Sequence, residues 1–166
     1  MLPIRFSPDG QRVATGDTDH SVKLWNARTG SRIVTLKGHI SGVKHLAFSP
    51  DGQHLASTTE TTAHLWNLQS YQRERAFALL PTPASSDPLN NLADVAFSPN
   101  GQVLAIGSLL EPTTADDLFP RQGITLWQVE SGQQLGQIPD VAEFQFSPNG
   151  RFLIANGLDV QLWEPH

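Results

Sequence analysis

The 166-residue chain contains no cysteine, has few charged side chains and lacks long apolar runs. The absence of cysteine excludes a disulfide scaffold, a thiolate metal site and a cysteine nucleophile. Apolar runs reach at most five residues, whereas a membrane-spanning helix needs about 20. Only 16% of the residues are charged, and 16 acidic side chains outnumber 11 basic ones. The net charge of −5 argues against nucleic-acid binding, because phosphate contacts require clustered Lys and Arg.

The N-terminal residues Met1 to Arg5 are also without the apolar segment of a secretory signal peptide. Together with the short apolar runs, this predicts a cytoplasmic protein that makes no contact with a membrane. The length suits a single domain with a core of ordinary size.

What the sequence does contain is a repeat. The string Phe-Ser-Pro-Asp/Asn-Gly occurs four times, at spacings of 42, 49 and 49 residues, starting at Phe6, Phe48, Phe97 and Phe146. A Leu-Trp pair follows each copy, and these pairs use all four tryptophans, Trp25, Trp66, Trp127 and Trp163. A repeat of this period indicates stacked structural units of similar fold.

Each repeat has the pattern of short strands. The position two residues before the Phe is apolar in every copy, as Ile4, Leu46, Val95 and Phe144. This alternation predicts a strand with one buried face. Ser-Pro-Asp-Gly predicts a tight turn, because Pro fixes φ at about −65° at the second position and Gly tolerates whatever backbone conformation the fourth position requires. We therefore expect four antiparallel strands per repeat, the first repeat ending with a strand over Arg32–Leu36. Apolar positions that recur in every copy are what a repeated buried surface requires.

The second repeat, with Gly38-His39, Phe48 to Gly52 and Leu65-Trp66, resembles a WD40 repeat, and the other three resemble degenerate copies. The resemblance implies an all-β fold, with β-propeller blades built from four-stranded antiparallel meanders. The expected blades cover residues 1–37, 38–79, 92–138 and 139–166, the last without its fourth strand. Four such repeats would form an incomplete, open propeller, whose two end faces would expose apolar sheet surface of a size that monomers rarely show. We therefore expect a fragment or protomer of a larger propeller, completed by additional blades or by self-association. A closed four-bladed ring is the alternative.

The resemblance also implies a structural set of hydrogen-bonded side chains in each blade. An indole N–H between two blades needs an acceptor, and a buried histidine needs a fixed tautomer. The implied members are His39, Ser57, Glu60 and Trp66 in the second blade, and Thr15, Asp19 and Trp25 in the first. The third and fourth copies have Ile106 and Ala155 where the hydroxyl belongs.

Three histidines of the second repeat, His45, His54 and His64, invite a metal-site interpretation. Strand pairing from the turn sets His45 opposite about Thr58, several residues from His54, and no carboxylate cluster joins the histidines at ligand spacing. We therefore expect no metal, no cofactor and no catalytic residue.

Two inserts lengthen the repeats, at residues 80–91 and 108–123, and an up-and-down meander places both at the same edge. The second insert mixes apolar and acidic side chains, and long loops on a rigid scaffold often carry function. Its candidates for binding a protein partner are Leu110, Glu111, Asp116, Asp117, Leu118 and Phe119. The alternative is a tolerated loop without a role, since long insertions destabilise little.

These features predict a non-catalytic protein–protein interaction scaffold whose partner is a protein of unknown identity. One alternative is an enzyme that uses the central channel of a propeller, where Lys44, His45, Asp94 and Glu143 would lie. Others are a periplasmic TolB-like propeller, which also uses Phe-Ser-Pro-Asp-Gly turns, and a degenerate remnant without independent function.

Overall fold

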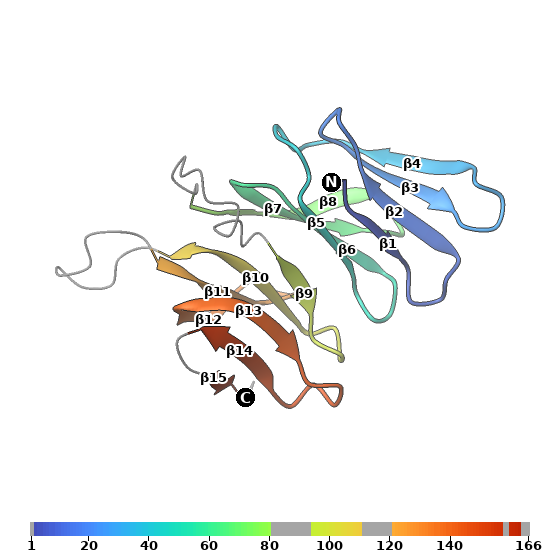
Figure 1. Ribbon diagram of the computed structural model, residues 1–166. Helices are drawn as coiled ribbons and strands as arrows, with labels where there is room; N and C mark the ends of the chain where they lie inside the picture. The colour runs from blue at the N-terminus through green and yellow to red at the C-terminus, as the bar shows by residue number, and fades with distance from the viewer. Residues whose placement is uncertain (1, 81–93, 111–120, 158–159, 164–166) are drawn as a thin grey trace. The chain divides into compact units, whose positions relative to one another are not determined.

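The computed structural model describes residues 2–80, 94–110, 121–157 and 160–163, which form strands and turns with no helix among them (Figure 1). The strands lie in four antiparallel sheets, and within each sheet every strand pairs with the next along the chain. The all-β fold class and the blade-like meanders expected from the sequence are confirmed. No described segment is a helix long and apolar enough to cross a membrane.

The first two sheets have four strands each. Sheet one consists of β1 (Ile4–Phe6), β2 (Arg12–Gly16), β3 (Val22–Asn26) and β4 (Arg32–Leu36). Sheet two consists of β5 (His45–Phe48), β6 (His54–Thr58), β7 (Thr62–Asn67) and β8 (Gln72–Ala78).

The last two sheets follow the same order. Sheet three consists of β9 (Val95–Phe97), β10 (Val103–Leu110), β11 (Arg121–Gln128) and β12 (Gln134–Pro139). Sheet four has three strands within the described residues, β13 (Val141–Phe146), β14 (Leu153–Gly157) and β15 (Val160–Trp163).

The tight turn between the first two strands has the same hydrogen bonds in all four repeats. In sheet one the Ser7 hydroxyl donates to the Asp9 carboxylate at 2.6 Å, and the Arg12 amide donates to the Ser7 hydroxyl at 2.9 Å. The glycine that closes the turn, Gly10, has φ +67°, a conformation that L side chains rarely adopt. Asn100 and Asn149 replace the aspartate in the third and fourth turns without loss of the bond from the serine.

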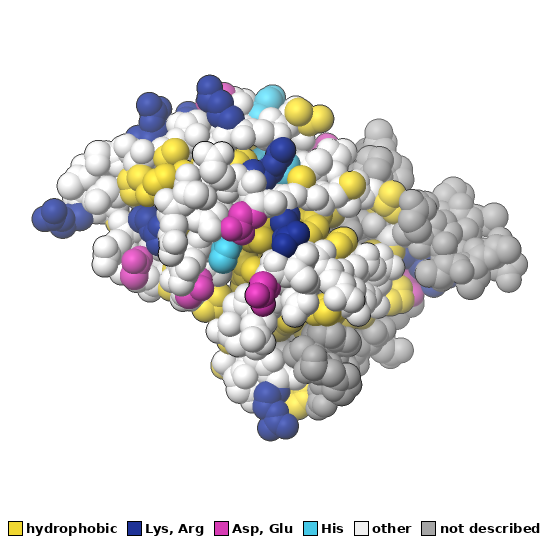
Figure 2. All heavy atoms as spheres, turned by 180° about the vertical axis from the view of Figure 1, so that it is seen from behind, with side chains coloured by type: hydrophobic (Ala, Val, Ile, Leu, Met, Phe, Trp, Pro, Cys, Tyr) yellow, Lys and Arg dark blue, Asp and Glu magenta, His cyan; other side chains and the backbone are white. Residues whose placement is uncertain are grey.

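The chain divides into two compact units, residues 1–78 and 79–166. Charged side chains lie at the surface, and apolar side chains also appear between them (Figure 2). Each unit contains two sheets whose facing sides form one apolar cluster.

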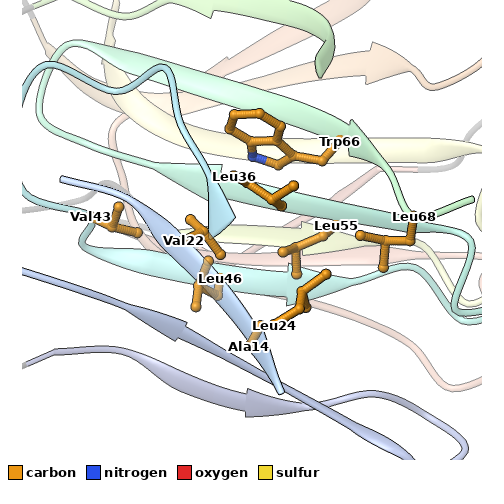
Figure 3. Packing of buried hydrophobic residues seen from close by; sticks show 9 residues of the cluster. All are labelled: Ala14, Val22, Leu24, Leu36, Val43, Leu46, Leu55, Trp66 and Leu68. Atoms are coloured by element: carbon orange, nitrogen blue, oxygen red, sulfur yellow. The ribbon is translucent and has the colours of Figure 1, made fainter. Parts of the chain in front are cut away.

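In the first unit, sheet one packs its inner face on sheet two (Figure 3). Sheet one contributes Ala14, Val22, Leu24 and Leu36. Sheet two contributes Leu46, Leu55 and Trp66, with Val43 and Leu68 from the segments that flank its strands. In the second unit, sheets three and four form the corresponding cluster from Val103, Ala105, Ile124, Leu126 and Ile138 on one side and Val141, Phe146, Leu153 and Ala155 on the other.

The first repeat exposes its apolar column, as expected for an end face of an open propeller. Ile4 is 57% exposed and Phe6 is 66% exposed. Their equivalents Leu46 and Phe146 are buried, because in each of those repeats another sheet of the same unit covers that face. The pattern therefore marks a face that can be buried, and a neighbouring sheet decides whether it is.

The second insert begins later than the repeat spacing suggests. Residues 108–110 extend β10 and residues 121–123 extend β11, so these two strands pair over eight positions. Gly123 allows this extension, since a Cβ there would lie 2.4 Å from Cδ1 of Leu110.

Candidate functional site

A buried polar cluster joins the strands of sheet two. The Trp66 indole N–H donates to the Ser57 hydroxyl at 2.8 Å, and Nε2 of His39 lies 2.7 Å from the same hydroxyl. Nδ1 of His39 lies 3.2 Å from the Thr62 hydroxyl. His64 stacks on His39 with ring centroids 3.9 Å apart. We call these five residues the His39 cluster.

Both histidines of the His39 cluster are neutral at pH 7. Burial lowers the pKa of His39 to about 3. His64, once it is protonated in acid, and the Arg73 guanidinium further disfavour a charged His39. Burial likewise lowers the pKa of His64 to about 4, with a further contribution from the Arg73 guanidinium. Nδ1 of His64 is buried and has no hydrogen-bond partner among the described residues. The histidines therefore act as packed, hydrogen-bonded rings at neutral pH.

The two acidic residues expected in these sets lie elsewhere. Glu60 forms an ion pair with Lys44 at 3.0 Å, and Thr62 meets His39 instead. In sheet one, the Ser21 hydroxyl donates to the Asp19 carboxylate at 2.5 Å and the Ser21 amide donates to it at 3.1 Å, and these bonds lower the pKa of Asp19. Both carboxylates stay partly exposed, where water solvates the charge, and this explains why uncharged hydroxyls take the buried places.

Sheet one has a simpler arrangement. The Trp25 indole N–H donates to the Thr15 hydroxyl at 2.9 Å, and both side chains are only partly buried. Lys23 pairs with Asp17 beside them, and this contact lowers the pKa of Asp17 to about 2. In sheets three and four the hydroxyl position holds Ile106 and Ala155, which are fully buried and apolar.

The remaining histidines of the second repeat do not converge. His45 pairs in register with Thr58, and Nε2 of His54 lies 3.2 Å from a carboxylate oxygen of Glu74. Among the described residues, no group of three or more metal-ligating side chains has the arrangement needed to hold an ion.

The candidate partner-binding residues of the second insert fall mostly outside the described residues. Glu111, Asp116, Asp117, Leu118 and Phe119 are among those not described. Leu110 is described, and it is buried at the end of β10, where it pairs in register with Arg121. Its side chain fills the space above Gly123 and does not present a free surface.

The repeat count predicted exposed apolar end faces, but none of the candidate site residues came from the exposed side of sheet one. Ile4, Phe6, Val13, Thr15 and Trp25 occupy one face through the register Ile4↔Thr15, Phe6↔Val13 and Val13↔Trp25. We call this the outer face of sheet one. A groove of about 510 Å³ lies at its edge, lined by Phe6, the Gly10 turn and residues 26–28. Comparing burial between the repeats is the signal that finds this face.

Sheet four has an exposed apolar residue at a different position. Ile154 is 44% exposed, whereas its equivalents Ala14, Ala56 and Ala105 are fully buried. It alternates along β14 with Leu153 and Ala155, which pack on sheet three, and so it lies on the opposite side. We call this side the outer face of sheet four.

Comparison with known proteins agrees with the repeat pattern. The family described as WD domain, G-beta repeat, or WD40, matches residues 4–26 and 30–67, which belong to the first two repeats.

Several curated proteins are similar over most or all of the chain. Periodic tryptophan protein 2 of Arabidopsis thaliana is 29% identical over 97% of the chain, and Pre-mRNA-processing factor 19 of Oryza sativa subsp. japonica is 33% identical over 61%. Nuclear distribution protein PAC1 of Arthroderma benhamiae is 27% identical over 97% of the chain. The matched part covers 17%, 18% and 39% of these three proteins, so the chain spans well under half the length of each.

Proposed function

The chain belongs to the WD40-repeat family, and from that premise we propose that it is a non-catalytic scaffold for protein–protein contact and one part of a larger propeller. WD40 relatives support an interaction role in general. The proposal adds which surface makes the contact, namely the outer face of sheet one.

The observation that carries this proposal is the exposure of Ile4 and Phe6. Fully burying an Ile or Phe side chain stabilises a protein by about 1.5–3 kcal/mol. Contiguous exposed apolar side chains on a folded protein commonly mark an interaction site. The equivalent face of sheet two, with Leu46 and Leu55, is buried by a neighbouring sheet, so a sheet-like partner suits the outer face of sheet one.

The contacts of the polar residues favour a scaffold over an enzyme. Lys44, a candidate for channel chemistry, is paired with Glu60. The Asp94 carboxylate accepts from the Val95 amide at 2.8 Å, next to the start of β9. Ser57 and His39 are hydrogen-bonded to each other within a buried cluster. Each of these groups has a structural partner.

A cytoplasmic location also remains part of the proposal.

Photo-crosslinking tests the proposal in cells. A photoreactive phenylalanine analogue in place of Phe6 is expected to crosslink to protein, because Phe6 would lie at the contact. The same analogue at Thr18, an exposed residue of the turn between β2 and β3, serves as the matched control. Equal labelling at the two positions would overturn the assignment of this face.

The second insert remains a proposed additional contact for a protein partner. Since residues 108–110 and 121–123 are paired in β10 and β11, residues 111–120 should be replaced by Asn-Gly, a two-residue turn that can connect the paired strand ends. This replacement is expected to leave the sheet intact and to weaken partner recovery. Unchanged recovery with an intact circular dichroism spectrum would remove the insert from the proposal.

A further inference from the structure

We infer that a second copy of this chain covers the outer face of sheet one, and that it does so with the outer face of its own sheet four. The inference rests on the proposed function, because it names the partner of the same surface.

The first unit provides a template for the contact. The inner face of sheet one, with Ala14 and Leu24, packs on the side of sheet two that carries Leu55 and Trp66. One side is thus built from small and aliphatic residues, and the other carries the tryptophan. Both sides are buried, with Leu24 and Leu55 fully inaccessible.

The second unit repeats the template with different residues. Ala105 and Leu126 of sheet three pack on the side of sheet four that carries Phe146 and Leu153. The chain therefore makes this kind of contact twice, each time between an Ala-Leu side and a side with the Phe-Ser-Pro turn residue and its cross-strand partner.

The two outer faces have the complementary characters of this template. The outer face of sheet one carries Phe6, Val13 and Trp25, in the positions of Phe48, Leu55 and Trp66 of sheet two. The outer face of sheet four carries Ile154 in the position of Ala14, since Gln145↔Ile154 corresponds to Arg5↔Ala14. The outer face of sheet one thus corresponds to the side of the template that carries the Phe and the Trp. The outer face of sheet four corresponds to the Ala-Leu side.

The side-chain sizes on the two faces also compensate. Relative to the template, Ile154 is larger than Ala14, and Val13 is smaller than Leu55. Exchanges that conserve total volume disturb apolar packing least. A sheet-four face with Ile154 therefore suits a sheet-one face with Val13.

Such a contact joins different faces of the two copies and is heterologous, so it extends from copy to copy or closes into a ring. A contact between two outer faces of sheet one would instead be isologous. It would place Phe6 and Trp25 of one copy against Phe6 and Trp25 of the other. Neither unit of the chain packs two such sides on each other in its own core.

Two blocking variants test the inference by light scattering during size-exclusion chromatography. Wild-type protein is expected to assemble further as its concentration rises. Phe6→Asp and Ile154→Asp are each expected to weaken self-association about tenfold or more, because a charge would be buried in the contact. An equimolar mixture of the two is expected to form a 1:1 dimer that does not grow, since each variant retains the face that the other lacks.

Ile40→Asp is the control variant, because Ile40 is exposed and lies on neither outer face. It is expected to assemble like the wild type, and circular dichroism would verify the fold of all three variants. Assembly by Ile154→Asp but not by Phe6→Asp would indicate the isologous contact and overturn the inference.

A wild-type protein that stays monomeric at every concentration would also overturn the inference. Crosslinking from position 6 would then decide separately whether the proposed function holds, because a different protein could cover the same face. Failure of both experiments would reject the outer face of sheet one as a contact surface.

Discussion

Sheets one and two are built from the same repeat, yet they use its tryptophan differently. Trp66 is 2% exposed, donates to a serine that also meets a buried histidine, and lies under sheet one. Trp25 donates to Thr15 alone and is only partly buried. The backbone pairing around the two residues is equivalent, with Val13↔Trp25 matching Leu55↔Trp66.

The difference teaches that a strand pattern determines a sheet, whereas burial depends on what lies against that sheet. A hydrogen bond contributes most where water cannot replace it. The same Trp–hydroxyl bond should therefore stabilise sheet two more than sheet one.

The largest effect is expected at the two tryptophans. Trp66→Ala removes a fully buried ring and should reduce the free energy of unfolding by about 3–5 kcal/mol. Trp25→Ala should reduce it by roughly half as much or less, because part of the ring is already in water. Urea titration followed by circular dichroism measures both. Equal losses would show that sheet one is covered in solution.

Removing the hydroxyl that accepts from the tryptophan should also cost more stability in sheet two than in sheet one. Ser57→Ala leaves the Trp66 indole N–H and Nε2 of His39 without their shared partner, which should lower the free energy of unfolding by about 2–4 kcal/mol. Thr15→Ala should lower it by about 1 kcal/mol or less, since water can reach the Trp25 indole. A Ser57→Thr variant, which restores a hydroxyl, should recover part of the loss.

The strands and turns could be predicted because their signals are local. A Pro and a Gly at fixed places in the turn, with apolar residues at alternate positions, determine β1, β2 and their equivalents without reference to the rest of the molecule. The expected strand over Arg32–Leu36 coincides with β4. β10 and β11, however, each run three residues further than the repeat spacing indicated.

The site could be predicted less well because side-chain contacts depend on turn length and on neighbours. The sequence pattern suggested Glu60 for a place that Thr62 occupies, since the turn is one residue shorter than in sheet one and the carboxylate reaches Lys44. It did not suggest that His64 would stack on His39. The count of four repeats predicted exposed apolar end faces, but the column of Ile4 is apolar in all four copies and so did not by itself show which copy is exposed.

Acid should destabilise the His39 cluster. The pKa values of about 3 and about 4 for His39 and His64 lie below the ordinary value of 6.5, so the unfolded chain binds protons first. Stability is therefore full above pH 6.5 and falls as the pH drops toward 4. By pH 5 each histidine should account for a loss of about 2 kcal/mol.

The conservative variant His64→Gln separates this effect from general acid unfolding. It should remove roughly half of the loss between pH 7 and pH 5, because one proton-binding group is gone. Urea midpoints at a series of pH values measure the slope. An unchanged slope in His64→Gln would mean that His64 titrates alike in the folded and unfolded chains.

The smallest effect concerns the link between the turns of sheets one and two. Nη2 of Arg12 donates to the Gly52 carbonyl at 2.7 Å, which ties the side of sheet one to the turn of the next repeat. Arg12→Ala should reduce the free energy of unfolding by about 1 kcal/mol, the usual value for one hydrogen bond that is partly open to water. Arg28→Ala, at an exposed turn residue, is the matched control and should change it by less than about 0.5 kcal/mol. If Arg12→Ala also raised the hydrogen-exchange rates of β2 and β5 together, sheets one and two would unfold as one unit. The apolar cluster between the two sheets would then be enough to hold sheet one in place, with no partner bound to its outer face.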